Sequence, residues 1–279
     1  MIYGAHFSVA GGVINALHTA ERLKVNALQF FIRSPRNYHQ KDIEEEDVQA
    51  FRAKRAALGI RHAAVHAVYL QNLASAKDAF HKKSIESNVA DIIEASRLGA
   101  DSYILHLGSH KDIPLSQGID RVVKGLKSIT AEIPEGVNVL LENVSGAKNL
   151  VGSDFAMLAE ILDRCGRPRN IGICIDTCHA WCCGYDIASP EGLDTFASSV
   201  HATVGLDSVK LIHVNDTKDE CGSKNDRHAN IGQGKIGAEG IGRFINHASF
   251  RNQVFILETP VEEDDLYVTD LDLLRKLRV

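Results

Sequence analysis

Residues 137–177 read VNVLLENVSGAKNLVGSDFAMLAEILDRCGRPRNIGICIDT, and this stretch decides the fold. Two runs of mainly aliphatic residues, 137–144 and 171–177, flank a segment in which apolar residues recur every three or four positions from Phe155 to Cys165. The glycine that follows Cys165 is typical of a helix end. A strand, a helix and a second strand in this order are the repeating unit of proteins with a parallel sheet.

The same unit repeats from one end of the chain to the other. No linker or change in composition interrupts it, and a barrel of eight such units commonly needs ~250 residues, close to the 279 of this chain. We therefore predict a TIM (β/α)8 barrel that forms a single domain over residues 1–279. The predicted strands are Ile2–Val9, Ala27–Ile32, His62–Tyr69, Ser102–Leu107, Val137–Val144, Ile171–Thr177, Val209–Asn215 and Val254–Glu258.

The composition is that of an ordinary globular protein, with 44% hydrophobic and 24% charged residues. No apolar run approaches the ~20 residues of a membrane-spanning helix, and the first residues do not resemble a signal peptide. The six cysteines lack the spread of a disulfide framework. We expect a cytoplasmic, monomeric protein without a membrane or obligate protein partner. The formal net charge of −5 argues mildly against a polyanionic partner.

Residue types that bind divalent metals stand at the ends of six consecutive predicted strands. The carboxyl ends of barrel strands meet at one rim, where TIM-barrel enzymes have their active sites. Several unneutralised carboxylates at one rim would repel one another, which favours cations over ion pairs among side chains. The six residues are His66, His106, Glu142, Asp176, His213 and Glu258.

The loops after two of these strands add His179, Asp226 and His228, which makes nine candidate ligands. Zinc takes about three or four protein ligands, so nine suit two or three ions, with zinc and manganese both open. His6 ends the first predicted strand and faces the same rim. The cysteines near His179 could be a thiolate site, but we interpret them as small buried residues.

A glycine motif, Gly232–Gly237 (GQGKIG), matches the dinucleotide-binding pattern. A polar loop precedes it and no acidic ribose partner follows in a strand, which argues against that function. We expect the small glycines to let a phosphate backbone approach the rim.

Three stretches carry a resemblance to the endonuclease IV family of apurinic/apyrimidinic (AP) endonucleases, and the similarity covers essentially the whole chain. They are residues 66–74 (HAVYLQNLA), 173–179 (ICIDTCH) and 213–234 (HVNDTKDECGSKNDRHANIGQG). The resemblance implies a TIM barrel with three metal ions, usually Zn²⁺, with Mn²⁺ possible in part. The departures from the family pattern are Ala67, Gln71, Leu107 and Trp181, and they bear on the DNA-facing rim more than on the chemistry.

By position, the resemblance implies three groups of ligands, each of which would hold one metal ion. The first group is His66, His106 and Glu142. The second is Glu142, Asp176, His213 and Glu258, and the third is His179, Asp226 and His228. The resemblance also implies that Arg36 inserts into the DNA stack and that Tyr69 fills the gap beside the lesion. Glu258 or Glu142 would assist the nucleophile as the catalytic carboxylate.

The implied activity is hydrolysis of the phosphodiester 5′ to an AP site in duplex DNA, which leaves a 3′-hydroxyl and a 5′-deoxyribose phosphate, with possible 3′-end cleaning. A xylose-isomerase-like sugar isomerase or epimerase is the main alternative. It would need one metal, for which Glu142, Asp176, His213 and Glu258 suffice. A lesion-binding protein without turnover is a further alternative.

Overall fold

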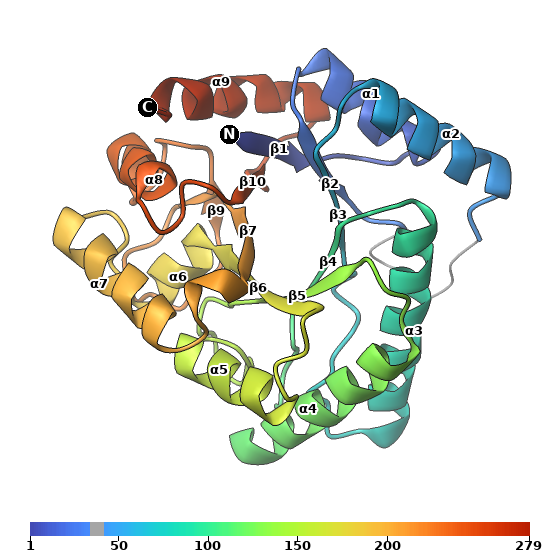
Figure 1. The fold of residues 1–279 in the computed structure, drawn as a ribbon. Helices are drawn as coiled ribbons and strands as arrows, with labels where there is room; N and C mark the ends of the chain where they lie inside the picture. Colours follow the sequence, from blue (N-terminus) through green and yellow to red (C-terminus); the bar gives the residue numbers. More distant parts are fainter. Residues whose placement is uncertain (34–41) are drawn as a thin grey trace.

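The computed structural model describes residues 1–33 and 42–279. Eight parallel strands close into a barrel in the order β1-β10-β7-β6-β5-β4-β3-β2, and helices surround it (Figure 1). The predicted TIM barrel is confirmed. The barrel strands are β1 (Ile2–His6), β2 (Ala27–Phe30), β3 (His62–His66), β4 (Ser102–Leu105), β5 (Asn138–Glu142), β6 (Ile171–Asp176), β7 (Val209–His213) and β10 (Val254–Leu257).

Each strand lies within its predicted range, and most predicted ranges run too far at the carboxyl end. Tyr69 and Val9, for example, lie in loops, because the chain leaves the barrel shortly after β3 and β1 end. A short antiparallel pair, β8 (Asp216–Thr217) and β9 (His228–Ala229), forms in the long loop after β7.

The helices form the outer ring, in which α9 lies between α8 and α1 (Figure 1). Two helices, α6 and α7, follow β6 where the alternation predicts one. The left-handed φ of 113° at Gly184 ends α6. The helices are α1 (Ile14–Arg22), α2 (Glu45–Ala57), α3 (Asp78–Arg97), α4 (Leu115–Glu132), α5 (Phe155–Arg164), α6 (Thr177–Cys183), α7 (Pro190–Ala202), α8 (Gly237–Asn246) and α9 (Val268–Leu277), with 3-10 turns η1 (Leu206–Ser208) and η2 (Asp264–Tyr267).

An apolar layer fills the middle of the barrel and fixes the side chains above it. Because alternate residues of a strand face the barrel interior, the residue two positions further along points to the same side. Ala64 is followed in this way by His66, Leu140 by Glu142, and Leu211 by His213. The layer consists of Ala27, Ala64, Ile104, Leu140, Cys174, Leu211, Val254 and Ile256. The strand register therefore places the polar rim directly on a packed support.

A second and larger apolar core lies between the barrel and its helices. It includes Phe30 of β2, which packs against Phe51 of α2, and the stacked rings of Phe244 and Phe250 beside α8. Burial of such side chains removes apolar surface from water and is the main favourable term in folding. In the part of the chain that the structure describes, no helix combines the length and apolarity needed to cross a membrane.

Candidate metal centre

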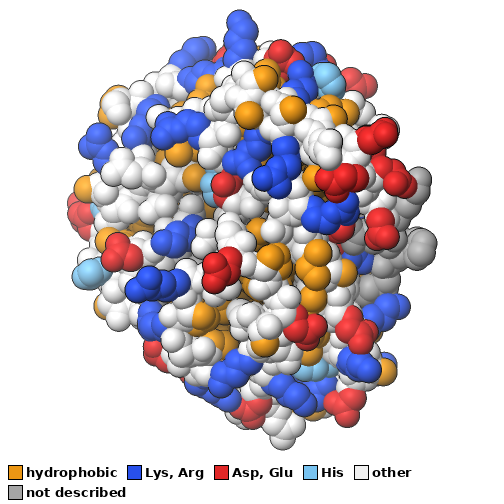
Figure 2. Space-filling view, turned by 45° about the vertical axis from the view of Figure 1, so that its right-hand side comes forward, with side chains coloured by type: hydrophobic (Ala, Val, Ile, Leu, Met, Phe, Trp, Pro, Cys, Tyr) orange, Lys and Arg blue, Asp and Glu red, His pale blue; other side chains and the backbone are white. Residues whose placement is uncertain are grey.

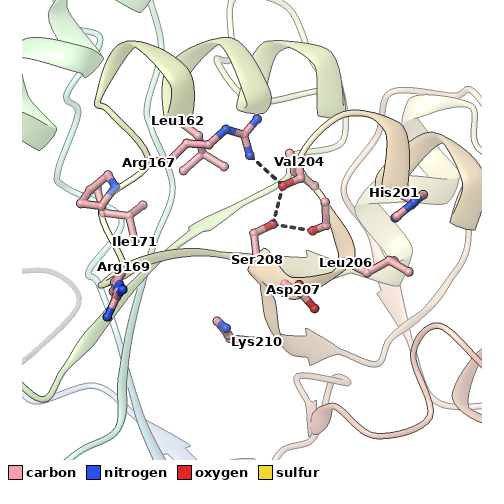
Figure 3. A pocket seen from close by; sticks show the side chains of 12 residues that line it. Leu162, Arg167, Arg169, Ile171, His201, Val204, Leu206, Asp207, Ser208 and Lys210 are labelled. Atoms are coloured by element: carbon pink, nitrogen blue, oxygen red, sulfur yellow. Dashed lines mark hydrogen bonds between the residues drawn. The ribbon is translucent and has the colours of Figure 1, made fainter.

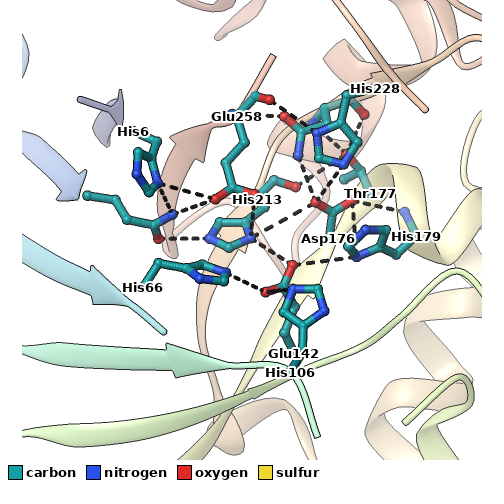
Figure 4. Close-up of polar contacts among 12 residues, drawn as sticks. His6, His66, His106, Glu142, Asp176, Thr177, His179, His213, His228 and Glu258 are labelled. Atoms are coloured by element: carbon teal, nitrogen blue, oxygen red, sulfur yellow. Dashed lines mark hydrogen bonds and ion pairs between the residues drawn. The ribbon is translucent and has the colours of Figure 1, made fainter. Parts of the chain in front are cut away.

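All nine candidate ligands meet at the carboxyl end of the barrel, and Figure 4 labels eight of them, all but Asp226. In the first group, Glu142 Oε2 lies 3.1 Å from Nε2 of His66 and 3.1 Å from Nε2 of His106. The ligand atoms of these three residues all lie within 4.8 Å of one another. Strands β3 and β5 supply His66 and Glu142 from their last positions, and His106 directly follows β4.

The second group shares Glu142 with the first. Nδ1 of His213 lies 3.0 Å from Glu142 Oε1 and 3.2 Å from Glu258 Oε2, and Asp176 Oδ2 is 4.0 Å from the same nitrogen. Ligand atoms of all four residues again lie within 4.8 Å of one another. One carboxylate, that of Glu142, thus has an oxygen available to each of two adjacent groups.

The third group combines a short helix with the loop after β7. Nε2 of His179 in α6 lies 3.1 Å from Asp226 Oδ2, and Nε2 of His228 lies 3.3 Å from Asp226 Oδ1. Asp176 caps α6 by accepting a hydrogen bond from the His179 backbone N–H (2.9 Å). This cap fixes His179 relative to the second group, because Asp176 belongs to both features.

In three of the five histidine ligands, the nitrogen that does not face the carboxylates is held by a hydrogen bond to the backbone. Nδ1 donates to a backbone carbonyl in His66 (to Ala67, 2.7 Å), His179 (to Asn143, 2.9 Å) and His228 (to Glu258, 3.1 Å). In each case Nε2 is the nitrogen left to face the carboxylates. Metal-binding histidines are held in this way, with one nitrogen on a hydrogen-bond acceptor and the other on the ion. The donor set therefore fits divalent metal ions.

The titration behaviour of the centre reflects this crowding of carboxylates and imidazoles. Burial raises the pKa of Glu142, but His106 and His213 outweigh it and hold that pKa well below its usual range. Burial lowers the pKa of His228, but Asp176 and Asp226 outweigh it and raise that pKa to about 9. Without ions, protons on the imidazoles neutralise the carboxylates. Binding of divalent ions must therefore release protons.

Two further residues of the centre extend the predicted set. Gln29 in β2 donates from Nε2 to Glu258 Oε1 (2.5 Å) and to Nδ1 of His6 (3.0 Å), and its Oε1 accepts from Nε2 of His213 (2.9 Å). His6 was predicted to face the rim, whereas Gln29 was not predicted, because an amide side chain is not a typical ligand for these metals. The register could have found it, since Gln29 stands two positions after Ala27 of the apolar layer.

The glycine motif at 232–237 encloses a carboxylate of the protein itself. The buried Asp216 accepts hydrogen bonds from the backbone N–H groups of Gly232, Gly234 and Ile236, each at 3.0 Å. A Cβ atom on Gly234 would lie 2.4 Å from Asp216 Oδ1. Because Asp216 already accepts from these backbone donors, they hold the loop in place, and the approach of a phosphate backbone to the small glycines stays a prediction.

Tyr69 stands at the rim with 71% of its surface exposed. Its ring centroid lies 5.8 Å from that of Phe31, 6.1 Å from His66 and 6.3 Å from His106. Arg36, the other residue predicted to contact DNA, lies outside the described residues. The loops that follow β4, β5 and β7 carry exposed basic residues, among them Lys111, Lys148, Lys218, Lys224 and Arg227. Acidic and basic side chains are interspersed on the face that Figure 2 shows.

A separate cavity of about 710 Å³ lies at the opposite end of the barrel (Figure 3). Residues just before and at the start of β6 and β7 line much of it, among them Arg169 and Lys210. Its place at the amino ends of these strands separates it from the candidate metal ligands. Active sites of TIM barrels lie at the other face, so this cavity is not part of the candidate centre.

Comparison with known proteins identifies relatives of the whole chain. The profile of the xylose isomerase-like TIM barrel family matches residues 17–277. "Probable endonuclease 4" of Natronomonas pharaonis is 38% identical over 274 residues, which cover 98% of this chain and 97% of that protein. The crystal structure of endonuclease IV from Thermus thermophilus superposes with a TM-score of 0.88 at 35% identity and covers 99% of this chain and 98% of that one.

A structure of D-psicose 3-epimerase with D-tagatose from Clostridium cellulolyticum also superposes, with a TM-score of 0.72 over the whole of both chains. At a sequence identity of 14%, this structural similarity shows a shared fold and carries no information about a shared activity. Fold and site together define the class, a xylose isomerase-like TIM barrel with candidate groups for divalent metals. Within that class the similarity is to the endonucleases rather than to the epimerases. The chain belongs to the endonuclease IV family and is an enzyme of the endonuclease type.

Proposed function

We propose that this protein is a DNA repair endonuclease of base excision repair that hydrolyses the phosphodiester 5′ to an AP site in duplex DNA. The expected products are a 3′-hydroxyl and a 5′-deoxyribose phosphate. The identity of 35% to endonuclease IV from Thermus thermophilus over nearly the full length supports this activity. The cytoplasmic location and the monomeric state stay predictions.

One observation carries the proposal, namely the number of ligand groups. The four residues Glu142, Asp176, His213 and Glu258 would be enough for a sugar isomerase with one metal. The first and third groups add five further side chains, two beside Glu142 and three that form a group of their own. Such a surplus supports three ions, for which we propose Zn²⁺, with Mn²⁺ as a possible partial substitute. The five additional side chains are His66, His106, His179, Asp226 and His228.

The charge of these ions reconciles the acidic chain with a polyanionic substrate. Bound ions would supply positive charge to the phosphate oxygens and lower the pKa of a bound water towards neutrality. The protein itself has a formal net charge of −5. The exposed lysines after β4, β5 and β7 surround the same end of the barrel and would contact the DNA backbone without reading sequence.

Glu258 is better placed than Glu142 to take the proton of an attacking water. The Glu258 side chain is 17% exposed, whereas that of Glu142 is 1% exposed. Gln29 holds Glu258 Oε1 by a hydrogen bond of 2.5 Å and so orients the carboxylate. We assign Glu258 as the general base and Glu142 as the shared ligand.

Tyr69 would contact the DNA at the lesion. Extrusion of an AP sugar costs less than extrusion of a normal nucleotide, because no base has to leave its stack. The exposed Tyr69 ring, packed on Phe31 beside the first ligand group, is suited to fill the resulting gap. We further propose that Arg36 inserts into the DNA stack, as the resemblance implies.

The direct test compares two 30-base-pair duplexes that differ only in a single AP site. We expect one cut, 5′ to the AP site, with a 3′ end that a polymerase can extend, and no cut in the intact duplex. His66→Ala and Glu258→Gln should abolish it, whereas His247→Ala, a control at the surface that pairs with Asp194, should not. Interconversion of ketoses by the same preparation, without incision, would replace this proposal by the epimerase alternative.

A further inference from the structure

A buried polar cluster lies behind Tyr69 and outside the candidate metal centre. Its middle is Asp91 of α3, whose side chain is 1% exposed and pairs with an Arg33 side chain that is 3% exposed. Asp91 Oδ1 accepts from Nε of Arg33 (2.7 Å), and Oδ2 accepts from Nε2 of Gln71 (3.0 Å). We call Arg33, Gln71, Ser87, Asp91 and Tyr103 the Asp91 cluster.

The remaining contacts complete the cluster. Gln71 also donates to Ser87 Oγ (3.0 Å), and the hydroxyl of Tyr103 in β4 lies 3.2 Å from Asp91 Oδ2. A buried ion pair such as Arg33–Asp91 is weak evidence for stability, because apolar residues of the same volume often serve as well. We therefore look for the role of this ion pair in the positions that it fixes for the chain segments it connects.

That geometry concerns two adjacent loops of the rim. Arg33 follows β2 and Gln71 follows β3, and a single carboxylate holds both. Phe31 lies two residues before Arg33, and Tyr69 lies two residues before Gln71. The rings of Phe31 and Tyr69 meet edge to face at 5.8 Å. The two loops are therefore joined twice, by the rings at the surface and by Asp91 in the interior.

Helix α3 provides the rigid support for this connection. Next to Gln71, the backbone N–H of Asn72 donates to Ser84 Oγ of the same helix (2.9 Å), and Asn72 Nδ2 donates to the carbonyl of Ser109 in the loop after β4 (3.0 Å). The segment that carries Tyr69 is thus held along a helix and not only at its end on β3. The backbone that carries the exposed Tyr69 ring is therefore held in place.

We propose that the Asp91 cluster positions Tyr69 for AP-site recognition by holding the β2 and β3 loops in register, with Asp91 as the positioning residue. This inference rests on the proposed function. It also explains Gln71, which departs from the aliphatic residue of the family pattern: in this chain the amide connects the Tyr69 loop to a carboxylate with which an aliphatic side chain could not bond.

The test uses the metal-loaded protein with Asp91→Asn and Gln71→Leu, and Glu86→Gln as the control on the exposed side of α3, where Glu86 pairs with Lys82. Assays run at pH 8, because burial raises the pKa of Asp91 to about 6. We expect KM for AP-site duplex to rise about ten- to a hundredfold, since small misplacements of positioning groups have effects of that size. The kcat and the bound metal should stay at wild-type values.

Hydrogen exchange provides a readout that does not depend on the substrate. Amides of residues 67–73 should exchange at least tenfold faster in Asp91→Asn than in the wild type and in the control. If Asp91→Asn does not fold, the double variant Arg33→Met/Asp91→Leu, which removes both charges, replaces it with the same expected results. Unchanged KM and unchanged exchange, or a loss of metal, would overturn the inference. Failure of the wild type itself to cut would instead reject the proposed function.

Discussion

Replacement of Glu142 by glutamine is the perturbation whose effect the geometry defines best. Its Oε2 faces His66 and His106 at 3.1 Å each, and its Oε1 faces His213 at 3.0 Å. A neutral amide leaves only two imidazoles in the first group, too few for zinc, which takes about three protein ligands. The second group would keep Asp176, His213 and Glu258, and the third group does not contain Glu142.

Glu142→Gln should therefore lose about one ion per chain rather than all of them. Loss of one Lewis acid costs several kcal/mol of transition-state stabilisation, and about 4 kcal/mol corresponds to a thousandfold slower incision. Metal is counted by emission spectrometry on dialysed protein, and incision is followed on the AP-site duplex. Glu160→Gln, an exposed change on α5 that removes a pairing with Arg164, is the matched control. Full metal content with incision within tenfold of wild type would refute the shared role of Glu142.

Other predictions concern the residues around this centre. Gln29→Leu should lower metal affinity about ten- to a hundredfold, measured by competition with a chelator, because His213 and Glu258 lose their hydrogen-bond partner. Tyr69→Ala should weaken binding of AP-site duplex about tenfold in a fluorescence anisotropy titration, without change in metal content. In the metal-free protein, the raised pKa of His228 contributes stability to the fold that is fully present below about pH 6.5. This contribution is lost as the pH rises through about 9. The melting temperature should therefore fall over that pH range, and it should fall less with zinc bound. Asp216→Ala should destabilise the fold by about 3 kcal/mol in urea denaturation, because it leaves the N–H groups of the glycine loop without their acceptor.

Much of the fold could be predicted because hydrophobic periodicity is a local property. The strands and helices around Phe155 follow from their own residues, and the barrel follows from the repetition. Strand ends were the least accurate part, as at Tyr69, because a strand ends where it loses its neighbour and not where its side chains change character. The short pair β8–β9 was missed for the same reason, since it depends on a contact across the loop after β7.

The convergence of the six ligands at the strand ends could be anticipated because the strand register aligns alternate residues at one rim. The loop ligands Asp226 and His228 had no such register: they could be named as candidates from the loop after the seventh predicted strand, and their grouping with His179 came from the resemblance. Interactions over long sequence distances remained invisible, as with Gln29 and the partnership of Asp91 with Arg33 and Gln71. A polar side chain that holds another one has no spacing of its own in the sequence.

Anomalous diffraction from crystals of the zinc-loaded protein, recorded on both sides of the zinc absorption edge, tests the central claim most directly. We predict three peaks, one for each ligand group, with Glu142 between two of them. A single peak among Glu142, Asp176, His213 and Glu258 would contradict the trinuclear centre and favour the chemistry of a sugar isomerase.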